Sequence, residues 1–125
     1  MLAPVWDYDL SAGYVNPDPE SDLYYSNNWF VGLANSGTEF KKMYYAKLES
    51  YGDMINAEGK KLYDVYERNK LAINRNNKIW PIKTVIYPMN DKISSLKTYK
   101  AQLDYLVNYV SARHKSLLNS LSDWK

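Results

Sequence analysis

Residues 98–124, TYKAQLDYLVNYVSARHKSLLNSLSDW, carry the clearest structural pattern in the chain. Thr98 can cap a helix, and apolar residues then recur every three or four positions until the helix ends near Trp124. Such a stripe is typical of an amphipathic helix with one side against a core, so we predict a mainly α-helical fold. The apolar positions are Leu103, Leu106, Val107, Val110, Leu117, Leu118 and Leu121.

A second helix is expected to begin at Ser36. Ser36 and Glu39 have the spacing of a capping box, in which the serine accepts a hydrogen bond from the first turn and the glutamate returns one. Gly52 is a typical residue to follow the last turn of a helix, so the helix should end there. Its apolar stripe is formed by Phe40, Met43, Tyr44, Leu48 and Tyr51.

A third helix is expected to follow at once, with Asp53 as its cap. It should end among residues 74–77, because Trp80-Pro81 forbids helical continuation. Gly59 lies inside it and costs about 1 kcal/mol relative to alanine, which predicts either a break or tight packing at that point. The residues at helical spacing are Ile55, Leu62, Val65, Tyr66, Asn69, Ala72 and Ile73.

Two shorter segments complete the expected architecture. Residues 28–33, NWFVGL, are apolar and long enough for one or two helical turns. Residues 81–97 contain two prolines and several β-branched residues, which favours an extended segment that crosses the helices over a central strand.

The composition excludes several kinds of protein. Sixteen Lys and Arg residues against 14 Asp and Glu give a net charge of +2, and the charges are interspersed, whereas a nucleic-acid-binding protein normally concentrates them on one face. No apolar run approaches the roughly 18 residues of a membrane span. The chain has no cysteine, which excludes disulfides, thiolate metal sites and a cysteine nucleophile.

Two aspartates lie in an apolar and aromatic run, Pro4-Val5-Trp6-Asp7-Tyr8-Asp9-Leu10, which has the composition of a buried strand end. Burying a carboxylate is expensive unless a cation, a metal or several N–H groups compensate it. In an extended segment Asp7 and Asp9 lie on the same side. Two oxygen ligands on one side suit Mg²⁺ or Mn²⁺ held between protein and phosphates, and an ordinary surface turn is the alternative.

This acidic run resembles the metal-binding segment of the CotH family, spore-coat-type protein kinases with an atypical kinase-like fold. The resemblance implies that Asp7, with Asp9 beside it, is the counterpart of the metal-binding aspartate in the Asp-Phe-Gly of ordinary kinases. The matching residues are Pro4, Trp6, Asp7, Tyr8, Asp9 and Gly13.

The resemblance covers nearly the whole chain, although only the acidic run is chemically specific. In the family an apolar residue and a tryptophan usually follow the arginine of the last helix, whereas this chain has His114 and Ser116. The residues that match in the last helix are Thr98, Tyr99, Tyr105, Leu106, Tyr109 and Arg113. Those that match in the middle are Trp29, Phe30, Leu33, Phe40, Tyr44, Asn76 and Trp80.

The resemblance implies that residues 1–125 are the C-terminal part of a kinase-like domain, with three helices forming part of its larger lobe. In this division residues 1–13 are a metal-binding strand and turn, residues 14–35 a loop and short helix, and residues 36–125 a helical subdomain. The nucleotide-binding lysine and the catalytic-loop Asp and Asn of the family precede the acidic run, so the chain holds no complete catalytic set.

The implied activity is ATP-dependent phosphoryl transfer to protein Ser or Thr in a full-length parent, with Mg²⁺ or Mn²⁺ and ATP as cofactors. The chain alone is expected to be inactive and to bind the metal weakly. The expected partners are the missing N-terminal part of the same domain, or a second copy of the chain, on an exposed apolar face, and a protein substrate in the parent. The resemblance also implies an extracellular, cell-surface or spore-coat location.

An independent helical module, which binds partners or carbohydrate through its Tyr and Trp residues, is the alternative function. The only histidine, His114, lies seven residues from both Val107 and Leu121, so we expect a packing residue with a satisfied N–H. Arg113 is expected to form a structural salt bridge.

Overall fold

The computed structural model describes residues 18–20, 28–81 and 95–125. The helices in this part are α1 (Asn28–Ser36), α2 (Thr38–Ile79) and α4 (Tyr99–Ser120), followed by the 3-10 turn η1 (Ser122–Trp124). The predicted mainly α class is confirmed for these residues, and none of their helices is long and apolar enough to cross a membrane. The predicted strand and turn of residues 1–13 lie outside the described residues, as does most of the predicted extended segment.

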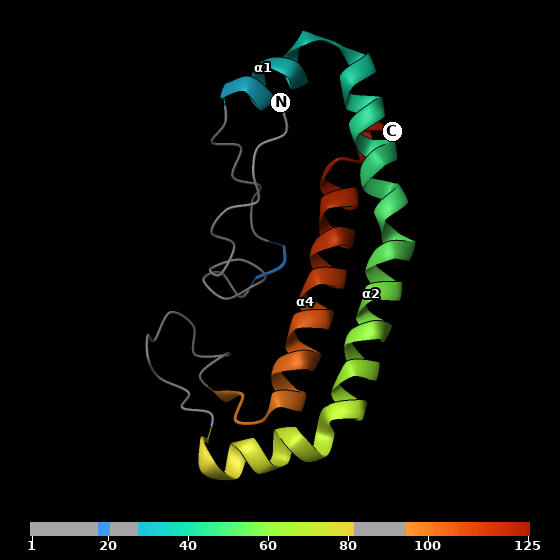
Figure 1. Ribbon diagram of the computed structural model, residues 1–125. Helices are drawn as coiled ribbons and strands as arrows, with labels where there is room; N and C mark the ends of the chain where they lie inside the picture. Colours follow the sequence, from blue (N-terminus) through green and yellow to red (C-terminus); the bar gives the residue numbers. More distant parts are fainter. Residues whose placement is uncertain (1–17, 21–27, 82–94) are drawn as a thin grey trace.

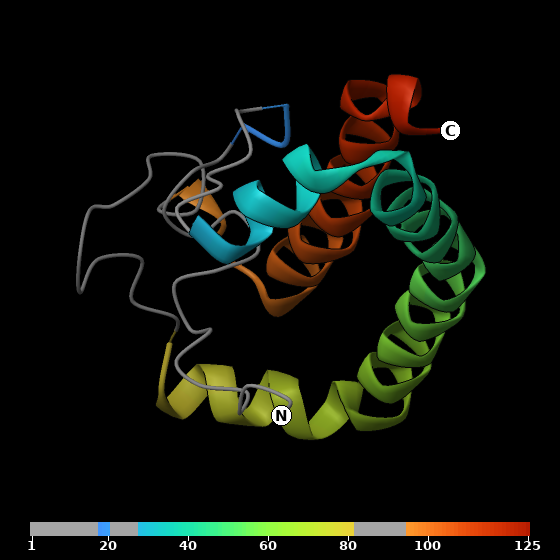
Figure 2. The same ribbon diagram turned by 90° about the horizontal axis from the view of Figure 1, so that it is seen from above.

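The helices α2 and α4 form an antiparallel hairpin, in which α4 returns along the inner side of the long α2 (Figure 1). Seen from above, α2 curves around α4, and α1 lies at the end of the hairpin where α2 begins (Figure 2). The hairpin therefore has a single seam between two helices, with α1 and η1 packed near one end of it.

The helix α2 is continuous over 42 residues, so the predicted end at Gly52 and the predicted new start at Asp53 are wrong. Gly52 lies on the side of α2 that packs against α4. A Cβ atom placed on it would be only 3.3 Å from Cε1 of His114. The close approach of α4 therefore explains why a glycine occupies position 52, and α2 continues through this residue.

Gly59 repeats this arrangement seven residues further along. It is buried, and a Cβ atom on it would lie 3.2 Å from Cγ1 of Val107. Of the two outcomes that the sequence allowed at Gly59, tight packing is the one observed. Because Val107 and His114 are also seven residues apart, the two glycines and their two partners fix the register of the antiparallel pair.

The seam follows a heptad pattern on both helices, since positions three and four residues apart alternate along it. Among the described residues the buried large apolar side chains are only Tyr45, 9% exposed, and Leu121, 5% exposed, and none is fully buried. Two helices make one layer of contacts and cannot enclose a core, which explains the low burial. The seam residues of α2 are Tyr45, Leu48, Gly52, Ile55, Gly59 and Tyr66, and those of α4 are Leu103, Val107, Val110, His114, Leu117 and Leu121.

The start of α2 differs from the predicted capping box. Its N-cap is Gly37, with φ 157° and ψ 172°, and no side chain caps the first turn. This backbone conformation is open mainly to glycine. Ser36 is instead the last residue of α1, where its hydroxyl donates to the carbonyl of Leu33 at 2.8 Å. The predicted capping box is therefore wrong, because Ser36 already ends the preceding helix.

The start of α4 agrees with the sequence, whereas α2 ends beyond the predicted residues 74–77, at the Trp80-Pro81 limit. The Oγ1 atom of Thr98 accepts a hydrogen bond from the backbone N–H of Ala101 at 3.1 Å, which confirms Thr98 as the N-cap of α4. At the other end, α2 stops at Ile79, immediately before Trp80-Pro81. The N–H of Trp80 donates to the carbonyl of Asn76 at 2.7 Å and completes the last turn.

The second half of α2 is bent, as both views show (Figure 1 and Figure 2). In this half, Arg68 Nε and Asn69 Nδ2 donate to the carbonyls four residues earlier, those of Asp64 and Val65, at 3.3 and 2.8 Å. Side-chain donors of this kind compete with the helical hydrogen bonds and are associated with bends.

Replacing Gly59 with leucine tests the close approach of α4. The Gly59→Leu side chain would collide with Val107, so we expect the free energy of unfolding to fall by about 1–2 kcal/mol in urea titrations followed by circular dichroism. Ala57→Leu places the same side chain on an exposed position two residues earlier and should be nearly neutral. Equal stability of the two variants would contradict the packing described for Gly59.

Candidate functional site

An apolar groove runs along one side of the seam between α2 and α4. It consists of two adjoining hollows of about 200 and 450 Å³, which share the residues Met54, Ile55 and Val110. The first is also lined by Glu58, Gly59, Leu62, Leu106 and Val107, and the second by Leu48, Tyr51, Tyr109, Arg113, His114 and Leu117. Because the hollows share residues from both helices, they form one continuous groove.

The side chains of this groove are apolar and substantially exposed. Met54 is 51% exposed, Leu62 43% and Leu106 37%, although the spacing of Leu62 and Leu106 predicts that they face a core. The only charged residues that line the groove are Glu58 and Arg113. An open apolar strip of this kind is typical of a surface that packs against another polypeptide.

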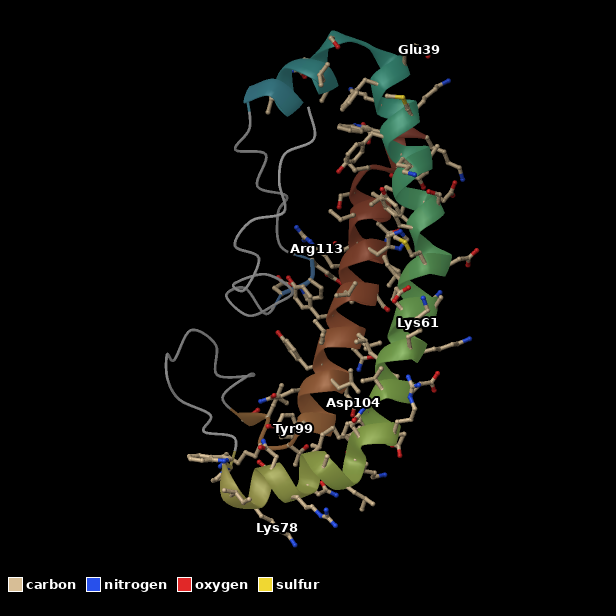
Figure 3. The ribbon with its side chains drawn as sticks, viewed as in Figure 1. Glu39, Lys61, Lys78, Tyr99, Asp104 and Arg113 are labelled. Carbon is tan, nitrogen blue, oxygen red and sulfur yellow. The ribbon has the colours of Figure 1, made fainter. Side chains whose placement is uncertain are left out.

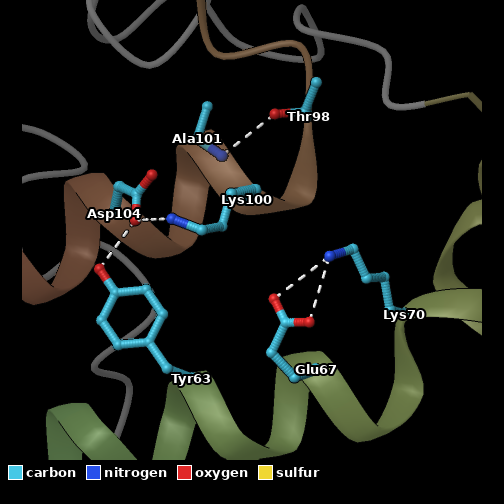
Figure 4. Close-up of polar contacts among 7 residues, drawn as sticks. All are labelled: Tyr63, Glu67, Lys70, Thr98, Lys100, Ala101 and Asp104. Atoms are coloured by element: carbon cyan, nitrogen blue, oxygen red, sulfur yellow. Dashed lines mark hydrogen bonds and ion pairs between the residues drawn. The ribbon is translucent and has the colours of Figure 1, made fainter.

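A polar cluster of Tyr63, Lys100 and Asp104 joins the two helices (Figure 4). Tyr63 donates from its hydroxyl to Asp104 Oδ1 at 2.8 Å, and Lys100 forms an ion pair with the same oxygen. The Lys100 ammonium also lies 5.0 Å from the centre of the Tyr63 ring. Tyr63 comes from α2 and the other two residues from α4, so the cluster links the two helices.

The charges of this cluster shift the ionisation of its members. The hydrogen bonds from Lys100 and then Tyr63 lower the pKa of the Asp104 carboxyl, and the hydrogen bond to Asp104 raises the pKa of the Lys100 ammonium. The hydrogen bond to Asp104 likewise raises the pKa of the Tyr63 hydroxyl. Since these groups are exposed to solvent, the cluster orients the helices more than it stabilises them.

His114 has the structural role that its position predicts. Its Nε2 atom donates to the carbonyl of Leu48 at 2.8 Å, and its ring packs against Gly52. This confirms a packing histidine with a satisfied N–H. The bond also uses a carbonyl on the opposite helix, so it reinforces the register set by the two glycines.

Arg113 lies next to His114 and points away from the seam toward residues 18–20 (Figure 3). One guanidinium nitrogen donates to the carbonyl of Pro19 at 3.0 Å. The described contact is therefore with the backbone, and it attaches the turn at residues 18–20 to α4. The predicted salt bridge of Arg113 stays a prediction.

The predicted metal ligands Asp7 and Asp9 lie outside the described residues. Within residues 18–20, 28–81 and 95–125, no group of three His, Asp or Glu side chains is placed to hold a metal ion. In these residues the structure therefore places no carboxylates or histidines close enough together to form a metal site.

The resemblance implied an exposed apolar face without locating it, and the sequence of α2 contains a signal for where the groove lies. The apolar residues of α2 form two neighbouring stripes, one with Leu48 and Ile55 and the other with Tyr51, Met54 and Leu62. Together they are wider than one packed helix covers. The excess width of the apolar face is the sign of a second packing surface.

Comparisons with known proteins add no relative. The chain matches no protein-family model, no curated protein and no solved structure. Any functional assignment therefore rests on the residues themselves and on the geometry of the hairpin.

The polar cluster predicts a specific dependence of stability on pH. Because the folded state lowers the pKa of Asp104, its stabilising effect is present above the ordinary carboxyl pKa and is lost as the pH falls through the lowered value. Asp104→Asn should therefore lower the melting temperature at neutral pH, and the difference from the unmodified chain should narrow below about pH 4. Asp53→Asn, an exposed position on α2, serves as the control. A difference that stays constant with pH would contradict this assignment.

Proposed function

We propose that the chain is the helical part of a larger domain, and that this domain is a CotH-like atypical protein kinase. The observation that supports the proposal is the open apolar groove lined by Met54, Leu62 and Leu106. The resemblance described above supplies the kind of domain. In the proposed parent, ATP-dependent phosphoryl transfer to protein Ser or Thr is the reaction.

The groove is the expected consequence of removing a neighbouring layer. Its α2 side and its α4 side each carry apolar residues at helical spacing, for example Tyr51 and Leu62 on α2 and Leu106 and Val110 on α4. A third element with an apolar face would fit between them, as a helix does in a bundle. In the proposed kinase this element belongs to the part of the domain that precedes the acidic run.

Asp7 and Asp9 are the proposed ligands of a divalent cation. Their carboxylate oxygens suit Mg²⁺ or Mn²⁺, which keeps several waters and is completed by the phosphates of ATP. The cation would neutralise the charge of the phosphoryl group in transfer. The lysine that binds the nucleotide and the residues that orient the acceptor hydroxyl come from the preceding part, so the chain alone should not transfer phosphate.

A helical interaction module is the second candidate function. It is favoured by the contacts that the hairpin makes within itself, which link α2 to α4 at His114 and Leu48, at Tyr63 and Asp104, and at Asn76 and Tyr99. A module of this kind would bind its partner in the same groove. The two functions differ in what precedes Asp7 in the parent protein: a lysine-bearing lobe and an Asp…Asn loop for the kinase, and neither for the module.

The kinase proposal is tested by phosphoryl transfer in the longer protein. With the codons that precede Met1 included, transfer from ATP should require Mg²⁺ or Mn²⁺, and Asp7→Asn should lower the rate by about 100-fold or more, since the phosphates lose their bound charge. Asp53→Asn, on the exposed side of α2, should leave the rate unchanged. A stop codon directly before Met1, or full activity of Asp7→Asn, would refute the proposal.

A further inference from the structure

The end of α2 has a composition unlike the rest of the chain. Residues 68–81, RNKLAINRNNKIWP, contain four cationic side chains and no Asp or Glu, although the net charge of the whole chain is only +2. The cations are Arg68, Lys70, Arg75 and Lys78. Of these, Lys70 pairs with Glu67 at 3.1 Å, and Arg68 donates to the carbonyl of Asp64 at 3.3 Å.

Three of the four cations share one face of the helix with apolar residues. Arg68, Leu71, Arg75 and Lys78 follow one another at steps of three, four and three, which places them in one row on the helix surface. All four are exposed. The half-buried residues of the same segment, Ile73 and Asn77, lie on the opposite side. Figure 3 shows Lys78 pointing away from α4.

Three apolar residues of this segment are the most exposed of the large hydrophobic side chains in the described residues. Leu71 is 77% exposed, Trp80 72% and Ile79 70%. None of them lines the groove between α2 and α4. Ile79 lies on the same side of the helix as the row of Arg68, Leu71, Arg75 and Lys78. We name these five residues the basic apolar face of α2.

We propose that the basic apolar face of α2 docks on an anionic lipid surface. The cations would contact the phosphates of the lipid headgroups, while Leu71 and Ile79 enter the boundary between headgroups and acyl chains. The proposal is independent of the proposed kinase function, since it uses none of the groove residues and neither Asp7 nor Asp9.

The shape of the face favours a flat surface over a peptide. The bend of α2 leaves this segment at the far end of the hairpin, past the start of α4 (Figure 1), with Lys78 pointing outward (Figure 3). A peptide is normally bound in a groove or at a sheet edge, whereas an exposed helical face meets a membrane along its length. The cations and the apolar residues are both exposed, so both can reach one surface together.

Vesicle sedimentation tests the proposal on the chain as it stands. We expect binding to vesicles of phosphatidylcholine mixed with phosphatidylglycerol, little binding to phosphatidylcholine alone, and weaker binding as salt is added. The double variant Arg75→Glu, Lys78→Glu should lower the affinity for the mixed vesicles by about tenfold or more. Leu71→Ser with Ile79→Ser should also lower it, because the apolar insertion is lost.

The matched control is Lys42→Glu with Lys60→Glu, which makes the same change of charge at two exposed positions elsewhere on α2. It should leave most of the binding intact. Circular dichroism checks that each variant keeps its helix content. If the Arg75→Glu, Lys78→Glu variant does not, Arg75→Gln with Lys78→Gln replaces it. The proposal is wrong if the mixed vesicles do not bind, if both charge pairs weaken binding equally, or if polyglutamate or RNA binds this face and the vesicles do not.

Discussion

The structure depends on the close approach of α4 to α2 at two glycines. Gly52 faces His114 and Gly59 faces Val107, at distances where even an added Cβ atom would require the neighbouring side chain to shift. These two contacts are seven residues apart on each helix, so both favour the same antiparallel register. That register places the His114 ring within reach of the Leu48 carbonyl and the Tyr63 hydroxyl within reach of Asp104.

The same close approach produces the groove. When two helices pack along one narrow seam, side chains at the edge of the seam remain partly exposed, as Met54, Leu62 and Leu106 do. These edge residues of the two helices line the apolar groove beside the seam. A hairpin with one seam therefore offers a surface for a third element, and this links the packing of the glycines to the proposed role as part of a larger domain.

The features that could be predicted from the sequence are those set by residues adjacent in the chain. Thr98 caps α4 and Trp80-Pro81 ends α2 because a cap and a proline act on the backbone directly beside them. Gly52 was predicted as a helix end, because the residue that explains it, His114, lies 62 positions away in the sequence. The packing role of His114 was predictable from its spacing, but its carbonyl partner was not.

The candidate sites were predictable to different degrees. Asp7 and Asp9 stand out chemically as two carboxylates in an apolar run, and their role stays a prediction. The groove could not be derived from periodicity alone, because Leu62 and Leu106 have the spacing of core residues. Whether such a residue is covered depends on how many helices pack around it, and beyond the end where α1 and η1 pack, α2 and α4 have only each other among the described residues.

The central claim is that the groove is a packing surface for the rest of a larger domain, and hydroxyl-radical labelling tests it most directly. The chain alone is compared with the protein extended by the codons that precede Met1. The account predicts that Met54 and Leu106 are labelled in the chain alone and protected in the longer protein, while Leu71, outside the groove, is labelled equally in both. Equal labelling of Met54 and Leu106 in the two proteins would contradict it.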